Sequence, residues 1–164
     1  MKLPERVTIC EVGTRDGFQI EPDFIPTELK VEVVNRLSDA GVPRIEVTSF
    51  VHPKVVPQLR DAEEVMAKIR RRPGTRYAAL VPNDKGAVRA VDAGVDVIHT
   101  VVSASESHNL ANVNMTVAES LEKLRGVQDP KVNDGSIGDE VRLVARDAVL
   151  LRKPLEDVTG GTFP

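Results

Sequence analysis

Short apolar runs alternate with segments of helical spacing along the first 125 residues. The runs that we expect to form strands are Val7–Gly13, Arg44–Phe50, Arg76–Pro82 and Val95–Ser105. Between them, apolar residues recur every three or four positions, as they do on one face of a helix. Four strand–helix units in succession predict an α/β fold with a parallel sheet. Such a pattern is equally typical of a doubly wound sheet and of a (β/α)8 barrel.

The helical segments carry start and stop signals. Thr27 can cap the first helix and Gly41 can end it, while Asn83 can cap the third. Thr116 and Glu119 form the T-x-x-E pattern of a capping box before another helix. In the first helix the predicted buried stripe consists of Leu29, Val33, Leu37 and Ala40.

The alternation of strand and helix patterns stops after about residue 125. The stretch QDPKVNDGSIGDE is rich in turn residues and acids, which is typical of a loop. The following EVRLVARDAVLLRK fits a strand pair or a short helix, and the pattern does not choose between them. We therefore divide the chain into a domain over residues 1–125 and a divergent tail over residues 126–164.

Composition narrows the function classes. A formal net charge of −3 and 3% aromatic residues argue against a nucleic-acid groove and favour a small molecule or a protein partner. No apolar run is long enough for a membrane span, and the N-terminus lacks the apolar core of a signal peptide, so we expect a cytoplasmic protein. The one cysteine, Cys10, excludes an internal disulfide and a multi-cysteine zinc site, and we interpret it as a packed core thiol.

Charged residues follow the first predicted strand in the stretch EVGTRDGFQIE. Functional residues of parallel α/β folds lie at the carboxyl ends of the strands. Asp16 there is a hard oxygen donor for Mg²⁺ or Mn²⁺, and Arg15 is a permanent cation suited to a carboxylate or a developing oxyanion. The alternative is a surface turn that carries a solvated ion pair.

The second predicted strand holds a carboxylate inside an apolar run. Glu46 is costly to bury without a partner, and Arg15 from the neighbouring strand is its expected counter-charge. This pair is either functional or purely structural. Ser49, where the strand closes, can offer a hydroxyl to a ligand, whereas His99 in the fourth strand is more typical of a core histidine.

Four stretches together resemble the hydroxymethylglutaryl-CoA lyase family: EVGTRDGFQIE, RIEVTSFVHPKVVPQ, LVPNDKG and SASESHNLANVNMTVAESL. They occur in order and at compatible spacing over about residues 4–125. The resemblance implies the N-terminal half of a (β/α)8 TIM barrel rather than an open sheet. It also implies cleavage of a 3-hydroxy acyl-CoA into acetyl-CoA and an oxo acid with Mg²⁺ or Mn²⁺.

The same resemblance implies roles for five residues. Asp16 corresponds to a metal ligand of the family, Arg15 to the arginine that stabilises the substrate's carbonyl or enolate oxygen, and Glu46 to the acid that orients this arginine. Gln19 and Ser49 correspond to positions that line the substrate pocket.

The family's barrel has eight strands, typically in about 250 residues, and four are predicted here. The family's His-x-His pair, its asparagine ligand and its catalytic cysteine on a glycine-rich loop have no counterpart in this sequence. Two alternatives therefore stand beside an incomplete lyase: a non-catalytic half-barrel that pairs with another chain, and a related Claisen-condensing synthase or aldolase. Because a half-barrel exposes strand edges, we expect a homodimer or higher oligomer, with an acyl-CoA as ligand and neither nucleic acid nor membrane as partner.

Overall fold

A computed structural model describes residues 5–125, 127 and 138–144. Five parallel strands form one sheet in the order β1-β2-β3-β4-β5. The strands are β1 (Cys10–Glu11), β2 (Arg44–Ser49), β3 (Arg76–Leu80), β4 (Val97–Ser103) and β5 (Gly138–Val144). The helices are α1 (Thr27–Asp39), α2 (Ala62–Lys68), α3 (Asp84–Asp92), α4 (Glu106–Val113) and α5 (Val117–Arg125). A π-helical turn, η1 (Gly13–Gly17), follows β1, and a 3₁₀ turn, η2 (Pro57–Leu59), precedes α2.

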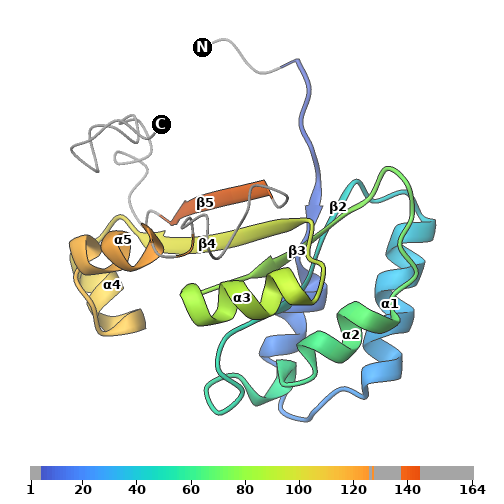
Figure 1. Cartoon of the computed structure of the whole chain (residues 1–164), viewed down its shortest axis with the longest axis horizontal. Coiled ribbons are helices and arrows are strands. Elements are labelled where there is room, and N and C mark those ends of the chain that lie inside the picture. The colour runs from blue at the N-terminus through green and yellow to red at the C-terminus, as the bar shows by residue number, and fades with distance from the viewer. Residues whose placement is uncertain (1–4, 126, 128–137, 145–164) are drawn as a thin grey trace.

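The main core lies where helices cover one side of the sheet. Helices α1, α2 and α3 line this side in Figure 1. Ile45 and Val47 of β2 and Ile98 of β4 belong to this core. Because side chains alternate along a strand, Glu46 and His99 lie on the opposite face. The expected α/β half-barrel with four βα units is confirmed, and the face opposite the main core carries the polar side chains of Glu46 and His99.

Two capping predictions are confirmed. The Asn83 side chain accepts a hydrogen bond from the Gly86 amide at 2.9 Å, which caps α3. The Thr116 hydroxyl accepts from the Glu119 amide at 3.1 Å, and the Glu119 carboxylate accepts from the Thr116 amide at 2.8 Å. These reciprocal bonds form the capping box of α5.

The first strand is shorter than predicted. Only Cys10 and Glu11 pair with β2, and Val7 and Ile9 before them are 80% and 67% exposed. β1 lies at the edge of the described sheet, so its upstream residues have no second strand there to pair with. The predicted strand Val7–Gly13 is therefore reduced to two paired residues, and the apolar residues before them are not buried.

The predicted buried stripe of α1 is also displaced. Leu29 is 48% exposed and Ala40 is exposed, whereas Lys30, Val34 and Ser38 are buried. Leu37 of the predicted stripe is partly buried and does pack against the core. Lys30 can be buried because it has an internal partner. Its ammonium group donates to the Asp61 carboxylate at 2.6 Å, next to the start of α2. Thr27, predicted as the cap, is instead the first residue of the helix after Pro26.

The region after residue 125 contributes a fifth strand. β5 pairs with β4 in parallel along its whole length, from Val97↔Gly138 to Ser103↔Val144. By sequence, Gly138 and Asp139 belong to the predicted loop and the segment from Glu140 onward fits a strand pair or a short helix, so the strand begins within the predicted loop. The domain boundary at residue 125 remains a prediction, and residues 145–164 lie outside the described part.

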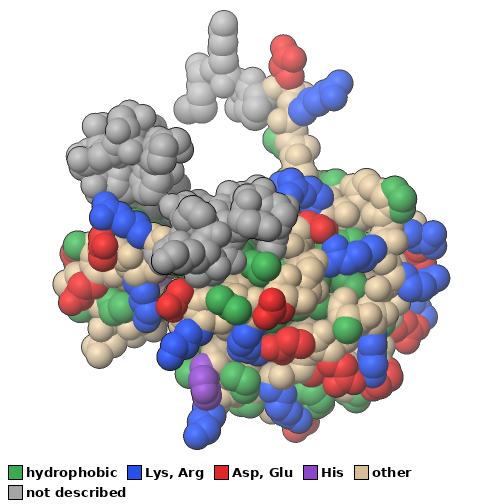
Figure 2. Space-filling view, viewed as in Figure 1, with side chains coloured by type: hydrophobic (Ala, Val, Ile, Leu, Met, Phe, Trp, Pro, Cys, Tyr) green, Lys and Arg blue, Asp and Glu red, His purple; other side chains and the backbone are tan. Residues whose placement is uncertain are grey.

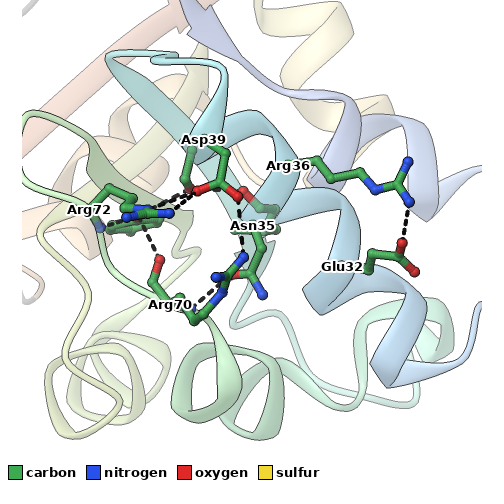
Figure 3. Close-up of polar contacts among 9 residues, drawn as sticks. Glu32, Asn35, Arg36, Asp39, Arg70 and Arg72 are labelled. Carbon is green, nitrogen blue, oxygen red and sulfur yellow. Dashed lines mark hydrogen bonds and ion pairs between the residues drawn. The ribbon is translucent and has the colours of Figure 1, made fainter.

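Ion pairs on the surface fasten the end of α1 to the loop before β3. Asp39 contacts the guanidinium groups of Arg70 and Arg72, at 3.2 and 2.6 Å, and the Arg70 amide donates to Asn35 (Figure 3). Acidic and basic side chains are interspersed over the face drawn in Figure 2. Among the described residues, no helix is both long and apolar enough to cross a bilayer.

Candidate active site at the ends of β1 and β2

The stretch Gly13–Gly17 forms the π-helical turn directly after β1. Turns of this kind are rare and are frequently found at functional sites. The amide of Asp16 donates to the carbonyl of Val12 at 2.7 Å, which holds the turn against the strand end. A Cβ on Gly17 would meet no atom within 4 Å, and its φ is not positive, so the fold does not require glycine there. The open space beside Gly17 is compatible with the approach of a ligand.

Arg15 reaches from this turn to Glu46 in the middle of β2. Its Nε donates to Oε1 of Glu46 at 2.9 Å, and the two side chains are 14% and 0% exposed. The Thr14 hydroxyl donates to the backbone carbonyl of Glu46 at 2.8 Å. The predicted Arg15–Glu46 contact is therefore confirmed. Because Glu46 holds its ε nitrogen, the Arg15 guanidinium group has a fixed orientation at the strand ends.

Asp16 lies beside Arg15 on the outside of the turn. Its carboxylate contacts Nη1 of Arg15, and its side chain is 61% exposed. A carboxylate that is accessible to solvent fits a hard divalent cation such as Mg²⁺, which favours oxygen ligands. Asp16 provides one such ligand, so further ligands are needed to complete an octahedral site.

The second oxygen of Glu46 faces His99 of β4. Oε2 lies 3.3 Å from Nδ1 of His99, and both side chains are fully buried. Burial alone would raise the pKa of Glu46, but the partners His99 and Arg15 together lower it below its usual range. The carboxylate therefore stays ionised inside the fold.

Cys10 joins the buried pair. Ligand atoms of Cys10, Glu46 and His99 all lie within 4.8 Å of one another. Sequence interpretation assigned Cys10 and His99 to the core and missed this grouping. The residues come from three different strands, and no short-range spacing connects them. Only the strand register places them together.

The two predicted substrate contacts differ in their surroundings. Oε1 of Gln19 is buried, and among the described residues it has no hydrogen-bond partner. Such an atom is costly unless a ligand supplies a donor, which agrees with a binding role. Ser49 is 1% exposed, and its Oγ accepts from the Val51 amide at 3.2 Å. That bond holds the backbone just after β2, and the contact of Ser49 with a substrate remains a prediction.

The family model described as HMGL-like matches residues 6–144. The chain belongs to the HMGL-like family. Hydroxymethylglutaryl-CoA lyase YngG of Bacillus subtilis is 49% identical over 129 residues, which is 79% of this chain and 43% of the relative. The human cytoplasmic 3-hydroxy-3-methylglutaryl-CoA lyase is 48% identical over 125 residues, covering 76% of this chain and 34% of the relative.

Solved structures agree with this membership. The HMG-CoA lyase of Bacillus subtilis superposes with a TM-score of 0.81 at 45% identity, covering 87% of this chain and 48% of that chain. An Acinetobacter baumannii HMG-CoA lyase in complex with coenzyme A and 3-methylmalate gives a TM-score of 0.77 at 42% identity, covering 83% and 44%. These relatives are carbon–carbon lyases with the barrel fold. The chain spans less than half of their length.

Proposed function

We propose that this chain supplies the N-terminal part of a lyase site that cleaves a 3-hydroxy acyl-CoA into acetyl-CoA and an oxo acid. The observation that carries the proposal is the fixed Arg15 at the strand ends, held by the buried Glu46 and adjacent to Asp16. The Acinetobacter baumannii relative, solved with coenzyme A and 3-methylmalate, supports an acyl-CoA as the ligand class.

The reaction creates negative charge on the substrate, and the Arg15 guanidinium offers a positive charge to it. The substrate hydroxyl loses its proton, the adjacent carbon–carbon bond breaks, and the electron pair moves to the thioester as an enolate. The oxo acid leaves, and protonation of the enolate carbon gives acetyl-CoA. Arg15 would stabilise the enolate oxygen with a guanidinium group already held in place, while Glu46 keeps that group oriented. Gln19 would contact the substrate through its buried amide oxygen.

A divalent ion fits the carboxylate of Asp16, and we propose Mg²⁺ or Mn²⁺ there. When bound, such an ion would polarise the hydroxyl and carbonyl oxygens of the substrate. Asp16 would hold the ion from the same turn that carries Arg15, so both positive charges would lie on one side of the substrate. Because one carboxylate is a small part of an octahedral shell, we expect little or no turnover by the chain alone.

A chimera tests the residues in a complete barrel. Residues 6–125 of this chain would replace the matching segment of the Bacillus subtilis relative, and turnover of hydroxymethylglutaryl-CoA would be measured with Mg²⁺ or Mn²⁺. We expect an active chimera in which Arg15→Gln lowers kcat by about 10²–10³-fold, as is typical when an oxyanion donor is lost. Asp16→Asn should remove metal-dependent activity, and Asp92→Asn, an exposed change on α3, serves as the control.

A folded chimera that stays fully active as Arg15→Gln or Asp16→Asn would contradict these roles. A folded but inactive chimera that still binds coenzyme A would favour a related synthase or aldolase, to be assayed by condensation of acetyl-CoA with oxo acids. The cytoplasmic location also remains a proposal, because the curated relatives include cytoplasmic and mitochondrial proteins.

A second candidate is a non-catalytic half-barrel that pairs with another chain. The exposed Val7 and Ile9 beside the β1 edge favour it, because apolar side chains at an open edge gain from being covered. Size-exclusion chromatography of the 164-residue chain decides on self-association: a dimer or larger species is expected, and a monodisperse monomer would contradict the predicted homo-oligomer.

A further inference from the structure

The group of Cys10, Glu46 and His99 has a chemistry different from that of Asp16. Its members offer a thiol, a carboxylate and an imidazole, and these ligand atoms lie within 4.8 Å of one another. Sulfur and imidazole ligands suit Zn²⁺ and similar transition metals, whereas Mg²⁺ and Mn²⁺ prefer sites made of oxygen. We propose that these three residues form a separate binding site for a Zn²⁺-class ion.

The distances allow three-point binding after small shifts. With zinc bonds of about 2.3 Å to sulfur and about 2.0 Å to nitrogen and oxygen, tetrahedral ligands stand roughly 3.5 Å apart. The ligand atoms, at most 4.8 Å apart, would therefore move by on the order of 1 Å to close on an ion. His99 and Cys10 extend from β4 and β1, so the sheet sets their spacing.

Glu46 can serve this site without releasing Arg15. Its two oxygens face different partners: Oε1 accepts from Arg15, and Oε2 lies on the side of His99. An ion bound through Oε2 would leave the arginine bond on Oε1 as an outer-shell contact. Such contacts orient metal-binding carboxylates in known sites.

The charges of the three ligands also suit a divalent cation. Binding replaces the thiol proton of Cys10, which is released to solvent, so the ion meets a thiolate, a carboxylate and a neutral imidazole. The thiolate and the carboxylate, which Glu46 shares with Arg15, offset much of the charge of a divalent cation and so lower the cost of holding it inside the fold. Glu46 and His99 are fully buried, whereas Cys10 is only partly buried and gives an ion a side from which to enter. Water would take the fourth position.

Cobalt titration of the 164-residue chain under reducing conditions tests the site. Co²⁺ replaces Zn²⁺ as a coloured probe, and a cobalt–thiolate bond gives a charge-transfer band. We expect saturation at one ion per chain with this band, and full reversal by added Zn²⁺, which the same ligands bind more tightly than Co²⁺. Cys10→Ser should abolish the band and weaken binding by at least about tenfold, since even outer-shell changes cost 10–100-fold.

Matched variants separate this site from others. His99→Gln should weaken binding as Cys10→Ser does, whereas His52→Gln, a histidine in the loop after β2, should leave it unchanged. Asp16→Asn should keep the cobalt band whether or not the proposed lyase site is functional. A titration without a thiolate band, or equal losses in the two histidine variants, would overturn the proposal. Circular dichroism checks that each variant is folded. If His99→Gln does not fold, the loss or retention of the thiolate band in Cys10→Ser tests the proposal.

Discussion

Asp61 neutralises a lysine that α1 directs into the protein. Nζ of Lys30 lies 2.6 Å from Oδ1 of Asp61, and the two side chains are only 3% and 7% exposed. Lys30 also donates to the carbonyl of Gln58 at 2.5 Å, and its ammonium group lies 4.1 Å from the ring centre of Phe24. Thr27 donates to the other oxygen of Asp61 at 2.8 Å. Asp61→Ala would leave this ammonium group buried without its counter-charge.

The expected cost is large for a single side chain. Breaking a buried ion pair by removing one partner typically costs about 3–5 kcal/mol, because the remaining charge is left uncompensated. A domain has a free energy of unfolding of about 5–15 kcal/mol, so the variant would lose a substantial share of its stability. Asp61→Asn keeps one of the two acceptor oxygens, so only one of the donors Lys30 and Thr27 retains its bond, and this variant should lose less stability than Asp61→Ala.

Urea unfolding, followed by circular dichroism, measures the effect. The matched control is Glu64→Ala, because Glu64 pairs with Lys68 at the same distance of 2.6 Å but with side chains that are 53% and 45% exposed. An exposed pair of this kind contributes about 0.3–0.5 kcal/mol. The urea midpoint should therefore fall strongly for Asp61→Ala and barely for Glu64→Ala, with similar slopes.

A further change separates charge burial from general damage. Adding Lys30→Met to Asp61→Ala removes the orphaned charge while filling a similar volume, and should recover much of the lost stability. The reasoning would be refuted if Asp61→Ala fell within about 1 kcal/mol of Glu64→Ala, or if Lys30→Met added a further loss.

Two other predictions concern glycines and acid stability. A Cβ on Gly86 would lie 2.9 Å from the carbonyl oxygen of Phe50, so Gly86→Ala should cost about 1–3 kcal/mol by overpacking, while Gly17→Ala should be nearly neutral in the same urea assay. Equal losses at both positions would contradict this. The hydrogen bond from Arg72 lowers the pKa of Asp39 from its ordinary value of 3.8. A carboxyl group with a lowered pKa stabilises the fold above pH 3.8, and this stabilisation is lost as the pH falls through the folded-state pKa. The difference in unfolding free energy between the wild type and Asp39→Asn should therefore shrink in acid. A difference that stayed constant from neutral to strongly acidic pH would rule this out.

Periodicity predicted the strand–helix order because each of these elements has a local signal. The Arg15–Glu46 contact was predictable for a related reason: a carboxylate inside an apolar strand requires a counter-charge, and parallel neighbours restrict where that charge can be. Local signals did not predict that Lys30 is buried, since a lysine is ordinarily a surface residue. Its burial depends on Asp61, a residue 31 positions away. The one-residue shift of the α1 stripe includes this lysine, whose burial no local pattern signals.

Glu46 belongs to both proposed sites. One carboxylate oxygen steadies Arg15 at the strand ends, and the other lies beside His99 within the fold. Glu46→Gln should therefore weaken both the lyase activity of the chimera and the binding of Co²⁺. Cys10→Ser should affect Co²⁺ binding only, because Cys10 belongs to the proposed Co²⁺ site and takes no part in the proposed oxyanion contact of Arg15. If the two losses always occurred together, Cys10 and Arg15 would belong to one site rather than two.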